Sequence, residues 1–510
     1  MELDPLLLII LALSVVWVSV FHLYKQRNSG HLPPGPPQKF LSGNIHQLPK
    51  TEPWKKYAEW AKEYGPIFHV RVFSRHIIVL NTSKAVTDLL ESRSSIYSER
   101  PIMWMYGELL GRKRTVFQIS SENPLHKTYR KLLRTGLDLR SIRSYQHLFE
   151  RENLIMLRAL YEKPEDFIRH IRRNAGGIIL EVAYGWTVKK DDDYFISLIQ
   201  EGFRITGMVT RPGAFPAEHF PFLRFIPSWM PGGRFRKQAA VWRKTMSDLG
   251  DVPHEWVKSQ MESGDYIESF TSKMLLPDGE APPSAEEEEN IKFCAEALYA
   301  GGADTTVAAM TAFFLLMAKF PSSQRQAQAE LSQVVGDERL PNWTDQDNLP
   351  YVRALIQETL RWASVAPLGL PHSVTRDDVY QGYHIPKGST VVANIWALMH
   401  DPDVYPDPDT FEPERYLQSR TNTPQPDPRK YVFGFGARVC PGSQFAEQSL
   451  FLSISSVLAT FDVAKCTSET GFAIEPEVDF TTGVTRHIKP FEITITPRKG
   501  SAGLRLVEAG

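Results

Sequence analysis

The chain is organised around a glycine-rich segment with a single cysteine, Phe433-Gly434-Phe435-Gly436-Ala437-Arg438-Val439-Cys440-Pro441-Gly442. Glycines allow backbone angles and close approaches that a Cβ would prevent, so we expect a tight loop here. The apolar residues that follow, from Ser443 to Leu452, recur at helical spacing. Cys440 therefore stands just before a helix N-terminus, where free N–H groups and the helix dipole favour a thiolate over a thiol.

The sulfur of Cys440 allows two interpretations. A lone cysteine is most often a small buried apolar side chain, and a glycine-rich turn is most often only a turn. Alternatively, a thiolate with open space above it suits the axial position of a flat metal cofactor. Phe433, Arg438 and the glycines stand at fixed spacing from Cys440. This combination is much rarer than a lone cysteine and favours the second interpretation.

The complete segment closely resembles the haem-ligand loop of the cytochrome P450 family of haem-thiolate monooxygenases. The resemblance implies haem b as the cofactor, with Cys440 as the axial ligand of the iron and with Phe433 and Arg438 in the binding loop. It also implies the fold of that family, which is mainly α-helical with a small β region. The resemblance extends from Pro33 to about Pro497 and rests on four motifs in the family's order.

Composition is that of an ordinary globular protein. Of the 510 residues 23% are charged and 42% are apolar, and the net charge of −1 gives no reason to expect a nucleic-acid partner. No long Gly/Ser linker divides the chain, so we expect one large domain. The three cysteines form no disulfide framework and suit a reducing compartment.

The N-terminal segment predicts a membrane anchor. Residues 6–24 are almost wholly apolar, and as a helix they would reach about 28 Å, close to the thickness of a bilayer core. A cleaved signal peptide is the alternative, but it would have a shorter apolar region and a basic N-terminal region. Lys25 and Arg27 follow the apolar run, which orients the downstream chain toward the cytosol.

A proline-rich stretch follows the anchor and reads Pro33-Pro34-Gly35-Pro36-Pro37. It predicts a stiff, extended segment and resembles the hinge of microsomal members of the family. We therefore expect an anchor over residues 1–27, a hinge over 28–50 and a haem-thiolate monooxygenase domain over 51–510. The expected location is the endoplasmic reticulum membrane, crossed once, with the catalytic domain on the cytosolic side.

Periodicity predicts helices over residues 54–64, 83–92 and 149–184, and strands within 67–80 around a polar turn. Ser83 is the expected N-cap of its helix, and Gly185 the expected C-cap. By resemblance, the aromatic segments 100–122 and 202–233 cover the substrate. The segment 480–485 resembles the C-terminal turn that reaches into the family's substrate pocket.

Residues 290–319 read as one long apolar helix that contains Ala300-Gly301-Gly302-Ala303-Asp304-Thr305-Thr306. Two glycines inside a helix cost about 1 kcal/mol each, so they need a reason. Close helix packing is one; the approach of a flat ligand is the other. Asp304 and Thr305 form an acid–alcohol pair that can deliver protons, and Thr305 can bend the helix. The stretch matches the family's oxygen-activation motif at every position.

Basic residues supply the remaining cofactor contacts expected from the resemblance. His126 and Arg130 share one face of a helix, and the family has Trp where this chain has His126. The resemblance implies that His126, Arg130, His372 and Arg438 contact the two haem propionates.

Three further residues resemble the family's buried structural network, in which a helical Glu and Arg meet the Arg of a distant loop. In this chain they are Glu358, Arg361 and Arg415. We expect them to hold the core behind the Cys440 loop rather than to take part in chemistry.

The expected function is insertion of one oxygen atom from O2 into a lipophilic small molecule, such as a secondary-metabolite intermediate. The chain has no dinucleotide fingerprint, so electrons from NADPH would come through a separate NADPH–cytochrome P450 reductase, with cytochrome b5 as a further candidate donor. Two alternatives remain: a haem-thiolate isomerase or dehydratase that does not use O2, and a non-catalytic haem- or ligand-binding membrane protein. The Asp304–Thr305 pair argues against both.

Overall fold

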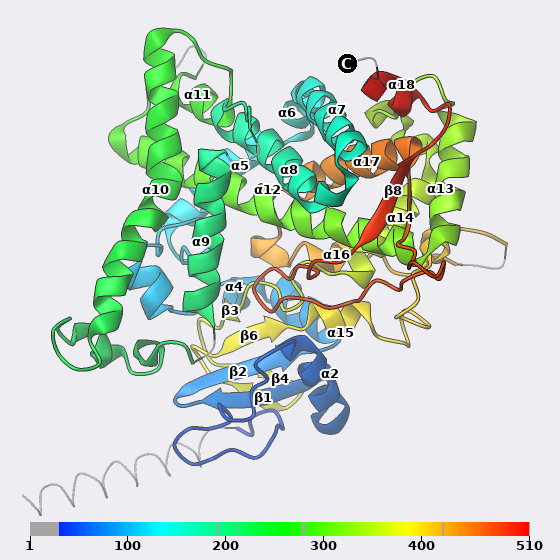
Figure 1. Ribbon diagram of the computed structural model, residues 1–510. Helices are drawn as coiled ribbons and strands as arrows, with labels where there is room; N and C mark the ends of the chain where they lie inside the picture. Colours follow the sequence, from blue (N-terminus) through cyan, green and yellow to red (C-terminus); the bar gives the residue numbers. More distant parts are fainter. Residues whose placement is uncertain (1–29, 191–192, 212, 278–280, 421–422, 509–510) are drawn as a thin grey trace, which may run out of the picture.

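The computed structural model describes residues 30–190, 193–211, 213–277, 281–420 and 423–508. The predicted anchor over residues 1–27 lies outside the described residues. Within them the protein is mainly helical with small sheets, as expected (Figure 1).

The elements follow the chain in this order. The α-helices are α2 (Pro53–Tyr64), α3 (Ser83–Val86), α4 (Ser94–Tyr97), α5 (Pro124–Gly136), α6 (Leu139–Ser144), α7 (Gln146–Glu162), α8 (Phe167–Tyr184), α9 (Tyr194–Thr210), α10 (Arg234–Ser263), α11 (Phe270–Leu275), α12 (Ala285–Lys319), α13 (Pro321–Val334), α14 (Pro350–Trp362), α15 (Ile395–Met399), α16 (Arg429–Val432), α17 (Ser443–Thr460) and α18 (Ala502–Glu508).

Short π- and 3₁₀-helical turns link them: η1 (Thr87–Ser92), η2 (Trp104–Leu109), η3 (Pro164–Asp166), η4 (Pro216–Glu218), η5 (Pro221–Phe225), η6 (Trp343–Asn348), η7 (Pro413–Tyr416) and η8 (Gly436–Arg438). The strands are β1 (Ile67–Val72), β2 (Arg75–Leu80), β3 (His372–Ser373), β4 (Asp378–Tyr380), β5 (Tyr383–Ile385), β6 (Thr390–Ala393), β7 (Phe461–Lys465) and β8 (Ile493–Pro497).

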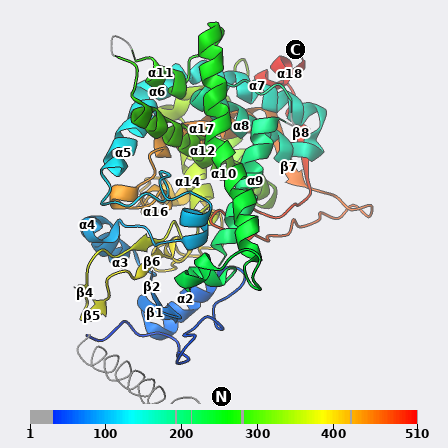
Figure 2. The same ribbon diagram turned by 90° about the vertical axis from the view of Figure 1, so that its left-hand side faces the viewer.

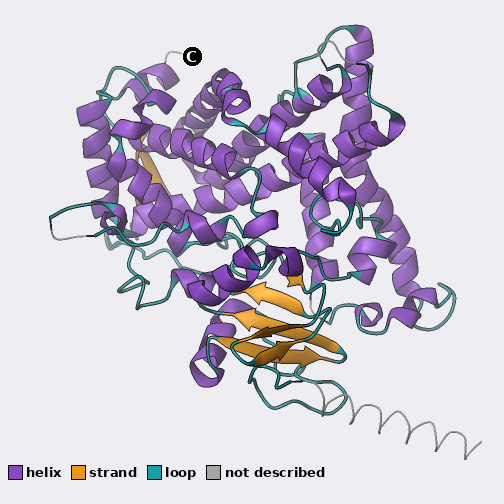
Figure 3. Ribbon diagram, turned by 180° about the vertical axis from the view of Figure 1, so that it is seen from behind, coloured by secondary structure: helices purple, strands orange, loops and turns teal. Residues whose placement is uncertain are grey.

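The largest sheet lies to one side of the helical body. Its strand order is β1-β2-β6-β3, with β2 and β6 parallel and the other pairs antiparallel. Figure 3 shows this sheet gathered below the helices, and β7 with β8 forms a separate pair among the helices. The sheet thereby joins residues 67–80 to the segment 372–393, which is far away in the sequence.

Helix α12 is the centre of the helical body, and α5, α8, α10 and α17 pack against it (Figures 1 and 2). Its N-terminus is closed by a capping box, in which Ser284 and Glu287 exchange side-chain and backbone hydrogen bonds. The predicted helix 290–319 is confirmed and starts five residues earlier, at Ala285. Because α12 is surrounded by other helices, it is apolar over most of its circumference.

Two details of the predicted N-terminal elements are wrong. The cap of α3 is Thr82, whose side chain accepts a hydrogen bond from the N–H of Ala85, and Ser83 is already helical. The expected single helix over 83–92 also divides into α3 and the π-helical turn η1. By contrast, Gly185 ends α8 in the left-handed region at φ 72°, as a C-cap glycine should.

The proline-rich stretch lies against the sheet. Pro34 O accepts a hydrogen bond of 2.8 Å from the N–H of His69 in β1, and a Cβ on Gly35 would lie 1.9 Å from His69 O. Gly43 also bridges Val72 of β1. Residues 34–43 thus extend the edge of the large sheet and are packed onto the globular body.

Among the described residues, one helix is long and apolar enough to cross a membrane by length and composition. It is α12, and 61% of its most apolar window is buried inside the protein. That burial is explained by its position at the centre of the helical body.

Candidate functional site

The Cys440 loop forms between α16 and α17. Gly434 and Gly436 have φ values of 81° and 53°, and a Cβ on Gly436 would lie 2.4 Å from Leu90 O, so both glycines are required by the backbone. Gly442 differs, because its φ is −95° and a Cβ there would meet nothing closer than 3.8 Å among the described atoms. The N–H of Cys440 donates to Phe433 O at 2.7 Å and closes the loop.

The sulfur lies directly before α17, as predicted, where effects of opposite sign act on the expected thiolate. Burial raises the pKa of the Cys440 thiol, and the Gly442 N–H and the Arg130 guanidinium only partly oppose it. A bound metal ion is what deprotonates a thiol in such surroundings. Cys294, a buried side chain of α12, has its thiol pKa raised further by burial.

The four predicted basic residues lie near one another beside the Cys440 loop. His126 is buried on α5 and lies within electrostatic reach of Arg130 and Arg438, while His372 lies within reach of Arg438. Arg130 donates to Val439 O at 2.6 Å, and Arg438 donates to Ser98 O and Ile119 O. Segments far apart in the sequence therefore bring two arginines and two histidines close to one another near the Cys440 loop.

Sequence reasoning missed a fifth basic residue, Arg100, which is 9% exposed. Its guanidinium donates to Phe117 O, Leu370 O and Pro371 O, and it lies within electrostatic reach of His126 and His372. Arg100 is the first residue of the aromatic segment 100–122, and none of the predicted basic residues stands at helical or strand spacing from it. Only its position before Pro101, at the start of the predicted covering segment, could have drawn attention to it.

Among the described residues, the guanidinium groups of Arg100, Arg130 and Arg438 donate to backbone carbonyls and form no salt bridge with an Asp or Glu. Glu99 attracts Arg100 and Arg438 from a greater distance and compensates their charge only in part. Burial, with repulsion from the neighbouring cations, lowers the pKa of Arg100 to about 9 and that of Arg438 to about 10. Such a cluster is costly until an anion enters it, so the residues present fit the two carboxylates of a haem.

The histidines support the same conclusion. His372 Nδ1 donates to Tyr97 O at 2.7 Å, which leaves Nε2 available to a ligand. Burial, together with Arg100 and Arg438, lowers the pKa of His372 to about 3, and burial with three arginines lowers that of His126 to about 4. Both imidazoles are therefore neutral until an anion compensates their surroundings.

The glycines of α12 have different surroundings. A Cβ on Gly302 would lie 2.8 Å from Cδ1 and Cγ1 of Ile179 in α8, so this glycine is required for close helix packing. A Cβ on Gly301 would meet nothing nearer than Phe117 Cζ at 3.9 Å. The expectation that both glycines admit a flat ligand is thus wrong for Gly302, whereas Gly301 borders open space. Thr305 donates from Oγ1 to Gly301 O at 2.7 Å, the contact by which a helical threonine bends its helix.

The Asp304 carboxylate is bound by a segment near the C-terminus. Thr485 Oγ1 donates to Asp304 Oδ2 at 2.6 Å, and His487 Nε2 lies 3.0 Å from Oδ1. The predicted approach of the segment 480–485 to the site is consistent with this contact. His487 was missed, because no sequence spacing connects it to Asp304.

The structural network forms as predicted behind the Cys440 loop. Glu358 and Arg361 are fully buried and joined by two hydrogen bonds of 2.7 Å. Arg415 reaches Glu358 Oε1 at 3.3 Å, and Tyr416 donates to Glu358 Oε2. The two arginines also donate to backbone carbonyls, so the carboxylate fixes three segments in one geometry.

The two predicted covering segments contact each other. Glu218 in η4 accepts hydrogen bonds from the backbone N–H groups of Trp104 and Met105, at 3.1 and 2.6 Å, and so caps η2. Arg224 lies 3.8 Å above the Trp104 ring. The described parts of segments 100–122 and 202–233 therefore contact each other, and we name them the cover because the resemblance predicts that they lie over the substrate.

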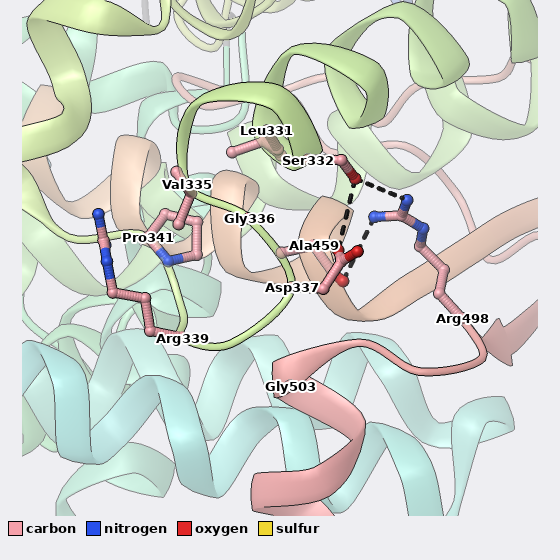
Figure 4. A pocket seen from close by; sticks show the side chains of 10 residues that line it. All are labelled: Leu331, Ser332, Val335, Gly336, Asp337, Arg339, Pro341, Ala459, Arg498 and Gly503. Atoms are coloured by element: carbon pink, nitrogen blue, oxygen red, sulfur yellow. Dashed lines mark hydrogen bonds between the residues drawn. The ribbon is translucent and has the colours of Figure 1, made fainter.

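A small hollow lies elsewhere, where Gly503 of α18 meets the α13–η6 connection (Figure 4). Ser332 and Arg498 are hydrogen-bonded to each other at its rim. Its volume of about 10 Å³ is that of a single water, so it is no ligand site.

Comparison with known proteins gives a consistent result. A family model described as "Cytochrome P450" matches residues 33–495. Cytochrome P450 monooxygenase 208 of Postia placenta is 42% identical over 486 residues, which cover 95% of this chain and 94% of the relative. Cytochrome P450 monooxygenase claR of Ampulloclitocybe clavipes is 38% identical, covering 96% and 91%. Cytochrome P450 monooxygenase COX2 of Coprinopsis cinerea is 36% identical, covering 94% and 92%.

Proposed function

The chain belongs to the cytochrome P450 family of monooxygenases, and from this premise we propose that it oxygenates a lipophilic small molecule with electrons that a separate reductase takes from NADPH. The family binds haem b through a cysteine thiolate. Cys440 is our candidate for that cysteine, because it stands in a loop of matching pattern before α17. When bound, the haem supplies the chemistry of oxygen activation, and the residues of the chain orient it and handle protons.

The observation that carries the proposal is a group of basic side chains that, among the described residues, form no salt bridge with an Asp or Glu. Arg100, Arg130, Arg438, His126 and His372 come from separate segments, yet all lie near the Cys440 loop. We propose that they hold the two propionates, which would replace missing counter-charges and fix the orientation of the haem. Phe433 would hold the loop through its carbonyl and pack against the cofactor.

Asp304 and Thr305 are the proposed proton-handling residues. Support comes from the Thr305 hydroxyl, which lies beside the Gly301 carbonyl on the open side of α12. Further support comes from Asp304, which is joined to a partly exposed histidine. The hydroxyl would act next to the substrate, and the carboxylate would lead toward solvent.

We also propose attachment to the endoplasmic reticulum membrane with the catalytic domain in the cytosol. Phe222, Phe225 and Trp229 are exposed on the cover, and Phe40 and Leu41 are exposed in the segment beside β1. The segments that carry them, the α9–α10 connection and the chain before α2, both run at the end of the molecule where the described chain begins (Figures 1 and 2). Exposed apolar clusters of this kind are typical of membrane contact and of the passage of lipophilic compounds. Secondary metabolism is the proposed setting, with NADPH–cytochrome P450 reductase as partner and cytochrome b5 as a further candidate.

The test is reconstitution with a reductase in lipid, with lipophilic compounds from the producing cells supplied together with NADPH and labelled O2. We expect one labelled oxygen atom per product. In Thr305→Ala, product per NADPH should fall and released hydrogen peroxide should rise, because the proton donor is lost. Product that forms without O2 would overturn the proposal in favour of an isomerase or dehydratase. Reduction by NADPH without any O2 uptake would favour a non-catalytic binding protein.

A further inference from the structure

The Asp304 carboxylate has two partners on one distant segment. Thr485 donates to Oδ2 at 2.6 Å, and His487 Nε2 lies 3.1 Å from Oδ2 and 3.0 Å from Oδ1. A carboxylate only accepts hydrogen bonds, so Nε2 is the protonated nitrogen of this imidazole. Thr305, the neighbour of Asp304, makes a different contact, within α12.

The segment that carries these partners is firmly held. Arg486 stands between them, is buried, and donates to Ser364 O at 2.9 Å and Trp362 O at 3.2 Å. Its backbone N–H donates to Val365 O. Because Arg486 is anchored between them, Thr485 and His487 are both held against Asp304 of α12.

The electrostatics show what this contact does to Asp304. Burial acts to raise the pKa of the carboxyl group, but the hydrogen bonds from His487 and Thr485 outweigh it and hold the pKa below its usual value. Arg172 of α8 adds a weaker attraction. His487 supplies the largest effects that oppose burial, so its removal should raise the pKa of Asp304.

The contact also reaches the solvent. The His487 side chain is 25% exposed and that of Asp304 is 20% exposed. Both groups of this contact therefore have access to water.

We propose that His487 and Thr485 are positioning residues that keep Asp304 ionised and that His487 recharges it with protons. This inference rests on the proposed role of Asp304 in monooxygenation. In the recharging step water or a buffer acid gives a proton to Nδ1 of the imidazole as the Nε2 proton passes to the carboxylate, so the ring never becomes an imidazolate; exchange with water then restores the Nε2–H tautomer. No bond between heavy atoms changes and no electrons are exchanged.

The test separates positioning from proton supply with two substitutions. His487→Gln keeps a side-chain N–H donor but cannot carry a proton, whereas His487→Ala removes both functions. His384→Gln is the matched control, because His384 Nε2 also faces a carboxylate, Asp377 at 3.8 Å, in the β4–β5 pair. Thr485→Val, compared with Thr485→Ser, tests the second donor.

The first measurement is infrared difference spectroscopy of the haem-loaded protein between about pH 8 and about pH 5. A protonated buried carboxyl group gives a C=O stretching band, which is assigned to Asp304 by its absence in Asp304→Asn. We expect this band to appear on acidification in His487→Ala and Thr485→Val. It should be absent in the parent protein, His487→Gln, Thr485→Ser and His384→Gln. If His487→Ala lacked the band, His487 would have no effect on Asp304 and the proposal would fail.

The second measurement is NADPH oxidation with the reductase, in water and in deuterated water. His487→Gln should lower the rate about tenfold and enlarge the solvent isotope effect, since proton supply is interrupted while the carboxylate stays in place. A parent-like rate and isotope effect in His487→Gln would overturn the recharging role. If instead Asp304→Asn oxidised NADPH and released peroxide like the parent, the proposed function of Asp304 would fail, whatever the infrared result.

Discussion

The adjacent glycines of α12 allow one chemical change to be made in two environments. Gly301→Ala and Gly302→Ala each add a single methyl group to the same turn. At residue 302 the new Cβ would lie 2.8 Å from Cδ1 and Cγ1 of Ile179 and 3.3 Å from its Cβ. At residue 301 the nearest atom is Phe117 Cζ, at 3.9 Å. The first contact is far inside van der Waals distance, and the second is ordinary.

The expected free energies follow from these distances. Each substitution gains about 1 kcal/mol of helix stability, because alanine is favoured over glycine inside a helix. Forcing extra volume against α8 costs about 1–3 kcal/mol. Gly302→Ala should therefore destabilise the protein by up to about 2 kcal/mol, while Gly301→Ala should stabilise it by up to about 1 kcal/mol.

The assay is thermal unfolding followed by helical circular dichroism, together with haem content. We expect a lower midpoint for Gly302→Ala, and for Gly301→Ala a midpoint that is unchanged or higher, with haem retained. Ile179→Ala removes both crowded atoms, so the Gly302→Ala/Ile179→Ala pair should show a favourable coupling of about 1 kcal/mol in a double-mutant cycle. A Gly302→Ala protein as stable as the parent, or a destabilised Gly301→Ala, would refute the assignment of Gly302 to helix packing.

Three further outcomes are expected. Cys440→Ala should lose the red-shifted absorption of the reduced CO complex that marks a thiolate ligand, whereas Cys466→Ala should keep it; the reverse result would contradict the ligand assignment. Arg361→Met leaves Glu358 buried without its main partner and should lower the unfolding free energy by about 3–5 kcal/mol. The same change at the exposed Arg353 is the control and should cost at most about 1 kcal/mol. Burial, with His76 and Arg71 nearby, lowers the pKa of His69 to about 3 in the folded protein. The neutral imidazole therefore contributes to the free energy of unfolding above about pH 6.5, and this contribution is lost as the pH falls toward 3. In His69→Gln the slope of the unfolding free energy against pH should be smaller by about 1.4 kcal/mol per pH unit in that window. An unchanged slope would argue against this role for His69.

Local sequence patterns predicted the elements whose causes are local. The apolar run of residues 290–319, the turn inside 67–80 and Gly185 at a helix end each depend on neighbours within a few positions. The cap of α3 was misassigned by one residue because Thr82 and Ser83 are both good caps, and only the backbone angles distinguish them. Motif spacing likewise identified the Cys440 loop and the Glu358–Arg361 pair, since each lies within one short segment.

The sequence alone therefore determined the family, the cysteine loop, the acid–alcohol pair and the central helix that carries it, because these features are written in contiguous residues. The tertiary structure decided what surrounds them. It brought Arg100 to the other cations, turned Gly302 toward Ile179, joined Glu218 to η2, and placed Thr485 and His487 on Asp304. It also set burial against the nearby N–H group and Arg130 at the Cys440 thiol. Burial, charge pairing and close packing depend on atoms that are distant in the chain, and no local spacing encodes those distances.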